Sequence, residues 1–172
     1  LQFRGFSVNA GFLPGAVTLL RNQITCATVT SPGGGIFVVQ QNSAVIEDNG
    51  VRACGVGIEV SKFSAPIANV RIAHDTVFPV DTMFYHVGIR PDGSLRGQIV
   101  GNRLVGGFYG IDVTTFGTDT IALDSNVVTA TGEAGIHMTT LFGATNPILG
   151  RFNNLLFNAG DGILVDCLNG AD

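Results

Sequence analysis

A short run that opens with Gly-Ile and continues with a polar and then an apolar residue recurs along the chain. The alternation of apolar and polar positions has a period of two, which is typical of β-strands, and helical periodicity is absent. Each run is therefore predicted to be one strand of a repeated unit. The runs are GIFV from Gly35, GIEV from Gly57, GIRP from Gly88, GIDV from Gly110, GIHM from Gly135 and GILV from Gly162.

A second landmark, an asparagine or aspartate with one aliphatic residue three positions before it and another two after, lies between consecutive runs. Successive landmarks are 27, 26, 27, 24 and 28 residues apart, a spacing typical of stacked repeats. Asparagine tolerates the backbone conformations of tight corners, and its amide can bond to the equivalent amide one repeat away. We expect such a ladder, interrupted at the acidic member because an ionised carboxylate only accepts hydrogen bonds. The landmarks are Asn22, Asn49, Asp75, Asn102, Asn126 and Asn154, the last with Arg151 in place of the leading aliphatic residue.

This pattern resembles the right-handed parallel β-helix of the pectate-lyase-like superfamily, with PbH1-type repeats, over roughly residues 15–172. The resemblance implies three strands per turn, with the GIxV run on the first strand and the asparagine between the second and third. The alternative is a leucine-rich repeat, because Ile99 to Leu104 reads I-x-x-N-x-L. That fold needs one strand per repeat, whereas the second run follows the asparagine by only eight or nine residues in four repeats.

The predicted fold is therefore all-β, a parallel β-helix solenoid of about six rungs that forms a single domain over residues 1–172. Residues 1–15 are expected to be an incomplete first rung. The end caps that natural solenoids carry are not apparent, so flanking domains or other copies of the chain are expected to supply them.

Composition narrows the functional classes. Hydrophobic residues make up 45% of the chain and charged residues 13%, which indicates an extensive core. A net charge of −4 without a basic stripe argues against nucleic acid, and no apolar run is long enough for a transmembrane helix.

By alternation Cys26 and Tyr109 point into the core. Cys26 and Cys54 are about one rung apart but differ by one in strand position, which argues against a disulfide.

The candidate site is the outward column formed by the x position of each GIxV run. It reads Phe37, Glu59, Arg90, Asp112, His137 and Leu164, with four ionisable residues in its middle. One position further out on the same face lie Val39, Ser61, Asp92, Thr114, Thr139 and Asp166. Long connections flank these rungs, and long loops on a rigid scaffold are where function concentrates. We expect a polysaccharide to lie along this first sheet, with contacts from His137, Asp166, and Tyr85 and His86 of an extended loop.

Two reactions are compatible with this column. Glu59 and Asp112 are two rungs apart, roughly 9–10 Å, which is near the upper limit for inverting glycoside hydrolysis. Arg90 between them would keep both carboxylates ionised, however, which suits a base and not an acid. The other reaction is β-elimination on a uronate polymer, for which the resemblance implies Lys62 and Arg90 as catalytic groups. Ca²⁺ held by Glu59, Asp112 and Asp92 is then the one cofactor expected.

A purely structural interpretation stays open beside these. Opposite charges on neighbouring strands stabilise a sheet by ~0.2–1 kcal/mol per pair, and the column alternates in sign well enough for that role alone. The sequence thus predicts a secreted, virion-associated or cell-surface protein that contacts carbohydrate, as a polysaccharide lyase or a glycoside hydrolase. The alternative is a non-catalytic shaft or adhesin segment, as in phage tail spikes, that forms homo-oligomers.

Overall fold

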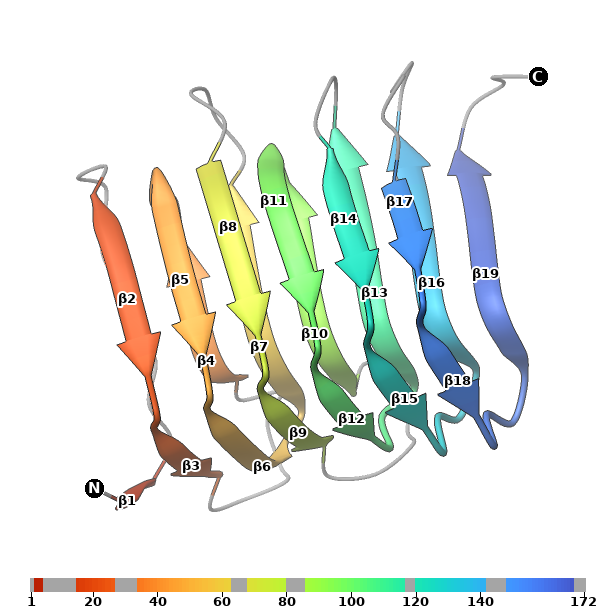
Figure 1. Ribbon diagram of the computed structural model, residues 1–172, viewed down its shortest axis with the longest axis horizontal. Coiled ribbons are helices and arrows are strands. Elements are labelled where there is room, and N and C mark those ends of the chain that lie inside the picture. The colour runs from red at the N-terminus through yellow and green to blue at the C-terminus, as the bar shows by residue number, and fades with distance from the viewer. Residues whose placement is uncertain are drawn as a thin grey trace.

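The chain forms a parallel β-solenoid in the computed structural model, as predicted (Figure 1). The structure describes residues 2–4, 15–26, 34–62, 68–79, 86–116, 120–141 and 148–168. Every element in these residues is a β-strand, and every pair of neighbouring strands is parallel. Within them no helix has the length and apolarity needed to cross a membrane.

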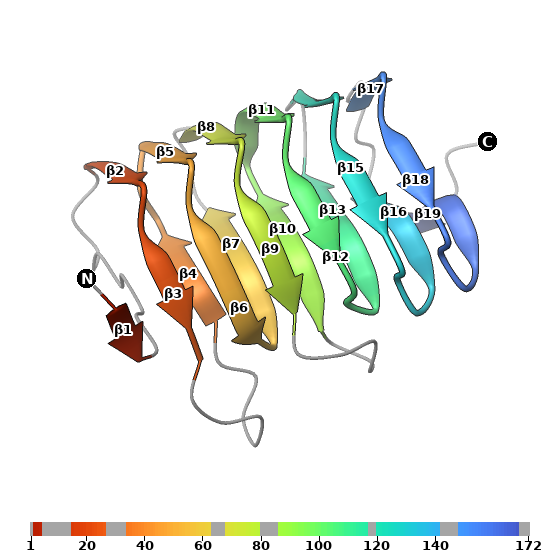
Figure 2. The ribbon, with the colours of Figure 1, turned by 60° about the horizontal axis from the view of Figure 1, so that its bottom comes forward.

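Three sheets run along the solenoid, and successive strands of the chain pass from one sheet to the next (Figure 2). Four turns are described without an internal gap, those that end with β7, β13, β16 and β19, so the expected count of about six rungs is corrected to about four turns. The first sheet contains β4 (Gly34–Val39), β7 (Val56–Lys62), β10 (Val87–Gly93), β13 (Tyr109–Phe116), β16 (Ala134–Leu141) and β19 (Asp161–Leu168).

The other two sheets complete each rung, and the third has one strand more than the others because β1 pairs with β3 at its edge. The second sheet contains β2 (Ala16–Leu20), β5 (Ser43–Glu47), β8 (Ala68–Ala73), β11 (Leu95–Val100), β14 (Ile121–Asp124) and β17 (Ile148–Arg151). The third contains β1 (Gln2–Arg4), β3 (Gln23–Thr25), β6 (Gly50–Cys54), β9 (Thr76–Pro79), β12 (Arg103–Val105), β15 (Val127–Thr129) and β18 (Asn154–Leu156).

The core is the stacked aliphatic column that the repeats predict. The isoleucines of the GIxV runs pair in register from one strand to the next: Ile36, Ile58, Ile89, Ile111, Ile136 and Ile163. Glycine precedes the isoleucines of β4, β7, β10, β13 and β16 because these first-sheet strands begin close to the neighbouring rung and to the third sheet. A Cβ on Gly57 would lie 2.3 Å from a Val77 methyl and 2.5 Å from the Gly88 oxygen, and Gly88 and Gly110 are equally confined.

The corner before the third sheet is built differently from the expectation. The residue with the left-handed backbone is the one before each ladder member, while the ladder residue itself supplies hydrogen bonds. These corner residues are Arg21, Asp48, His74, Gly101, Ser125 and Phe152, with φ between 52° and 65°. A second left-handed corner lies at the end of the third-sheet strands, at Ala53 within β6 and at Gly106, Ala130 and Phe157 directly after β12, β15 and β18.

The ladder itself is present, with one correction in its last rung. Its final member is Asn153, whose Nδ2 donates to the Leu123 carbonyl at 2.9 Å, and not Asn154. Asn154 is the first residue of β18 and is exposed. Consequently Gly150, and not Arg151, pairs with the buried Leu123 in the position that faces the core.

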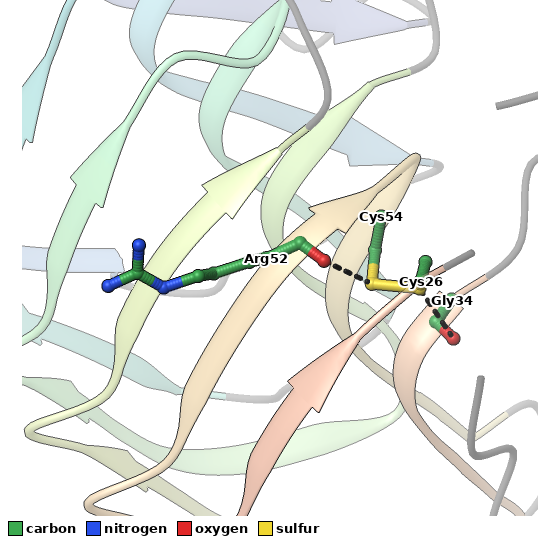
Figure 3. The surroundings of a disulfide bond; sticks show 4 residues. All are labelled: Cys26, Gly34, Arg52 and Cys54. Carbon is green, nitrogen blue, oxygen red and sulfur yellow. Dashed lines mark hydrogen bonds between the residues drawn. A yellow bond between two sulfur atoms is a disulfide. The ribbon is translucent and has the colours of Figure 1, made fainter. Parts of the chain in front are cut away.

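A disulfide joins Cys26 and Cys54, so the expectation that these cysteines are unpaired was wrong (Figure 3). Their Cα atoms are 5.1 Å apart. The one-residue offset is absorbed by Ala53, which has a φ of 55°, and by a register shift between Arg52 and Cys54. Strand alternation does not include such an irregularity, and this is why it placed the two sulfur atoms out of reach of each other.

Candidate functional site

The sheet register brings the predicted column together on the outer face of the first sheet. Glu59 of β7 pairs with Arg90 of β10, and Asp112 of β13 pairs with His137 of β16. The pairing of Ile89 with Ile111 places Arg90 beside Asp112. Four ionisable side chains therefore occupy neighbouring strands in the predicted order.

Arg90 lies between two carboxylates. Its Nη1 is 3.8 Å from Glu59 Oε2, and its Nε is 3.4 Å from Asp112 Oδ2. The three side chains are partly buried, with exposed fractions of 26% for Arg90, 12% for Glu59 and 14% for Asp112. A planar guanidinium with several donors suits such bridging, and the partial burial limits screening by solvent.

His137 continues the network toward the C-terminus. Its Nδ1 is 2.8 Å from Asp112 Oδ1, and its Nε2 is 3.0 Å from Asp166 Oδ2. Thr139 Oγ1 lies 3.5 Å from the same Nε2. Both ring nitrogens therefore lie within hydrogen-bond distance of a carboxyl group. The histidine ring is thereby fixed in place on the outer face.

Tyr109 belongs to this site, although alternation predicted that it points inward. Its ring stacks on that of His137, with centroids 4.3 Å apart and planes inclined by 18°. Phe108 packs against it edge-on, at 4.8 Å between centroids. The residue lies at the first position of β13, just before Gly110, where the strand begins and strict alternation does not hold. In the sequence, the one indication that Tyr109 belongs to the site is its position directly before the GIDV run that carries Asp112.

Burial raises the pKa of two carboxyl groups on the outer face of the first sheet, those of Glu59 and Asp92. It raises the pKa of Glu59, an effect opposed by the hydrogen bond from Ser61 Oγ at 2.8 Å and by the charge of Arg90. Burial also raises the pKa of Asp92, again against the charge of Arg90. Desolvation of the carboxyl outweighs the guanidinium, so the pKa of Glu59 is raised although Arg90, which was expected to keep this carboxylate ionised, lowers it.

Of the remaining predicted residues, Lys62 does not join this cluster. Lys62 is 3% exposed, and its Nζ donates to the Gln40 carbonyl at 3.2 Å and to Asn42 Oδ1 at 3.3 Å. It lies at the end of β7, and alternation directs it away from the face that carries Glu59. His86 immediately precedes β10, and its carbonyl accepts a hydrogen bond from the Phe108 nitrogen at 2.6 Å. Tyr85 lies outside the described residues.

The described residues contain no group of three or more His, Cys, Asp or Glu side chains placed to hold a metal ion. Comparison of the chain with protein-family models, with curated proteins and with solved structures finds no match.

Proposed function

We propose that this protein is a secreted or surface-exposed β-helix, similar in architecture to the pectate-lyase-like proteins, that binds a polysaccharide along the outer face of its first sheet. The observation that carries the proposal is the in-register row of partly buried polar side chains across β7, β10, β13 and β16. Such a row repeats at the strand spacing of ~4.8 Å, so an extended polymer lying across the strands meets a polar group at every step.

The chemistry of the row fits a sugar polymer. Arg90 supplies donors, Glu59 and Asp166 supply acceptors, and the Tyr109 ring adds an apolar surface of the kind that packs against the flat face of a sugar. The donors are held in place by their carboxylate partners, which reduces the entropy lost when a ligand binds.

Hydrolysis is favoured over elimination as the reaction of this face. A general acid must hold its proton near the working pH, and the raised pKa of Glu59 serves that purpose. Both oxygens of Asp112 are already bonded, to Arg90 and to His137. Asp92, one rung from Glu59 and two residues further along the same face, is the candidate base. Elimination lacks its lysine, since Lys62 is buried away from the row.

The disulfide supports the location outside the cytosol. Structural disulfides persist in oxidising compartments and are rare where thiols are kept reduced. The bond between Cys26 and Cys54 joins the ends of β3 and β6 in neighbouring rungs. We therefore place the protein in a secreted, virion or cell-surface setting.

The test is a panel of neutral and uronate polysaccharides. Binding is measured by affinity electrophoresis, and products are assayed for reducing ends and for the ultraviolet absorbance of unsaturated sugars. Arg90→Ala should abolish binding, whereas Arg96→Ala, on an exposed arginine of the second sheet, should leave it unchanged. Reducing ends without absorbance support hydrolysis, and absorbance would contradict the choice of reaction. Absence of binding to every polymer, or full binding by Arg90→Ala, would overturn the proposal.

A structural shaft is the second candidate, and one observation favours it. The corner residues Phe152 and Phe157 are 86% and 88% exposed. These exposed apolar corners suit contact with another chain. Sedimentation distinguishes the two functions, because a monomer that binds sugar supports the first and regular oligomers without sugar binding support the second.

A further inference from the structure

One member of the ladder is acidic. Asp75 is fully buried, at 0% exposure. Its Oδ1 accepts hydrogen bonds from the Asn49 backbone nitrogen at 2.6 Å and from Asn49 Nδ2 at 2.9 Å. The Asp75 backbone nitrogen donates to Asn102 Oδ1 at 2.9 Å. Its other oxygen, Oδ2, is buried and has no hydrogen-bond partner among the described residues.

The neighbouring rungs show which chemical group the ladder position of Asp75 accommodates. In Asn102 the Nδ2 donates to the Ile72 carbonyl and to Asn126 Oδ1, both at 3.0 Å. Asn126 repeats this pattern one rung after Asn102, and Asn49 repeats it two rungs before Asn102, in the rung that precedes Asp75. At Asp75 the equivalent acceptors are the Ile46 carbonyl and Asn102 Oδ1. A buried oxygen that faces acceptors is satisfied only if it carries a proton.

The charges around Asp75 do not favour its ionised form. The acidic groups Glu47 and Asp48 lie near it, at the end of β5 and at the following corner, and both disfavour a further negative charge. Thr76 of β9 is uncharged, and Arg103 of β12 is exposed. His74, the preceding corner residue, is also exposed. Asp75 forms no ion pair within the described residues, so the carboxyl has no cation to compensate its burial.

We propose that Asp75 keeps a proton on Oδ2 in the folded protein, completing the ladder as an asparagine would, and that loss of this proton weakens the rung leading to Arg90. Asp75 is thus the one pH-sensitive member of a ladder whose other described members are asparagine amides, which do not titrate. This inference does not depend on the polysaccharide function.

The direction of the effect follows from burial, which raises the pKa of Asp75 from 3.8 to about 7. Below about pH 4 the carboxyl is protonated in both the folded and the unfolded chain, and its stabilising contribution is fully present. Between about pH 4 and about pH 7 only the folded chain keeps the proton, so the folding constant falls up to about tenfold per pH unit. Above the folded pKa this contribution is lost and the dependence ends.

Denaturant unfolding of the oxidised protein between about pH 4.5 and about pH 8 tests the proposal. Asp75→Asn should be more stable than wild type at the upper end, and the difference should narrow steadily as the pH falls. Asp124→Asn is the matched control. It changes a partly exposed carboxylate that accepts a hydrogen bond from Ser125, outside the ladder, and should follow the wild-type curve.

The carboxyl ¹³C signal of Asp75 in the wild-type protein gives a second measurement that needs no variant. It should titrate far above the ordinary aspartate range, whereas the Asp124 signal serves as the internal reference. Parallel stability curves for wild type and Asp75→Asn would overturn the proposal, as would a less stable Asp75→Asn or an Asp75 signal that titrates at an ordinary value.

Discussion

Asn102 donates a hydrogen bond from its side-chain nitrogen to the side-chain oxygen of Asn126, at 3.0 Å. Both residues are buried, and Asn126 in turn bonds to Asn153. The three amides connect successive corners of the solenoid, where a rung passes from the second sheet to the third. Stability should therefore depend on them although they lie outside the strands.

Replacing Asn102 or Asn126 by alanine should each lower the free energy of unfolding by ~1–3 kcal/mol, because a buried amide and its neighbours lose their partners. Asn154→Ala is the control, since this exposed neighbour lies outside the ladder and should have little effect. Chemical denaturation measures all three. Unchanged midpoints for Asn102→Ala and Asn126→Ala would mean that the ladder contributes only backbone geometry.

The isoleucine column predicts a gradient of core effects. Ile111 is 0% exposed between Ile89 and Ile136, so Ile111→Ala should cost ~2–5 kcal/mol through lost burial and the cavity that remains. Ile163→Ala, in the same column but 53% exposed, should cost clearly less. Equal losses for the two variants in denaturant unfolding would show that the last rung is covered in solution.

The disulfide should stabilise the N-terminal rungs. It closes a loop with a sequence separation of 28 residues, for which the loss of unfolded-state entropy corresponds to about 3–4 kcal/mol. Reduction should therefore lower the melting temperature of the wild-type protein. The double variant Cys26→Ser/Cys54→Ser should melt near the reduced wild type and should not respond to reductant. A melting temperature insensitive to reduction would contradict this account.

Glu59 and Arg90 should be coupled in their titration. Arg90 lowers the pKa of Glu59 against the larger effect of burial, so Arg90→Ala should raise that pKa further, and Arg90→Lys should raise it less. Carboxyl NMR of Glu59 measures the shift. A pKa that does not move in Arg90→Ala would show that the 3.8 Å contact carries no interaction in solution.

The raised pKa of Glu59 also gives a stability prediction. Because the folded state favours the protonated carboxyl, its stabilising contribution is present at low pH and is lost as the pH rises through the folded pKa. Glu59→Gln should therefore become more stable than wild type at high pH. The difference should shrink toward low pH in denaturant unfolding, and Asp124→Asn again provides the control. A constant difference would exclude this linkage.

The repeat alone determined the parallel solenoid, the isoleucine column and the order of the charged row. Each of these features follows from the period-two alternation of apolar and polar residues. Shifting a strand by one residue would turn its apolar side chains from the core to solvent, so the pattern fixes which side chains face inward. Strict alternation also sufficed to predict that Glu59, Arg90, Asp112 and His137 lie on neighbouring strands of one face.

Tertiary structure decided the features that depend on local departures from that period. The left-handed Ala53 brought Cys54 to Cys26, and the start of β13 turned Tyr109 outward onto His137. Burial outweighed the charge of Arg90 in setting the direction of the pKa of Glu59. These outcomes depend on the direction and surroundings of single side chains, which a pattern of residue types does not contain.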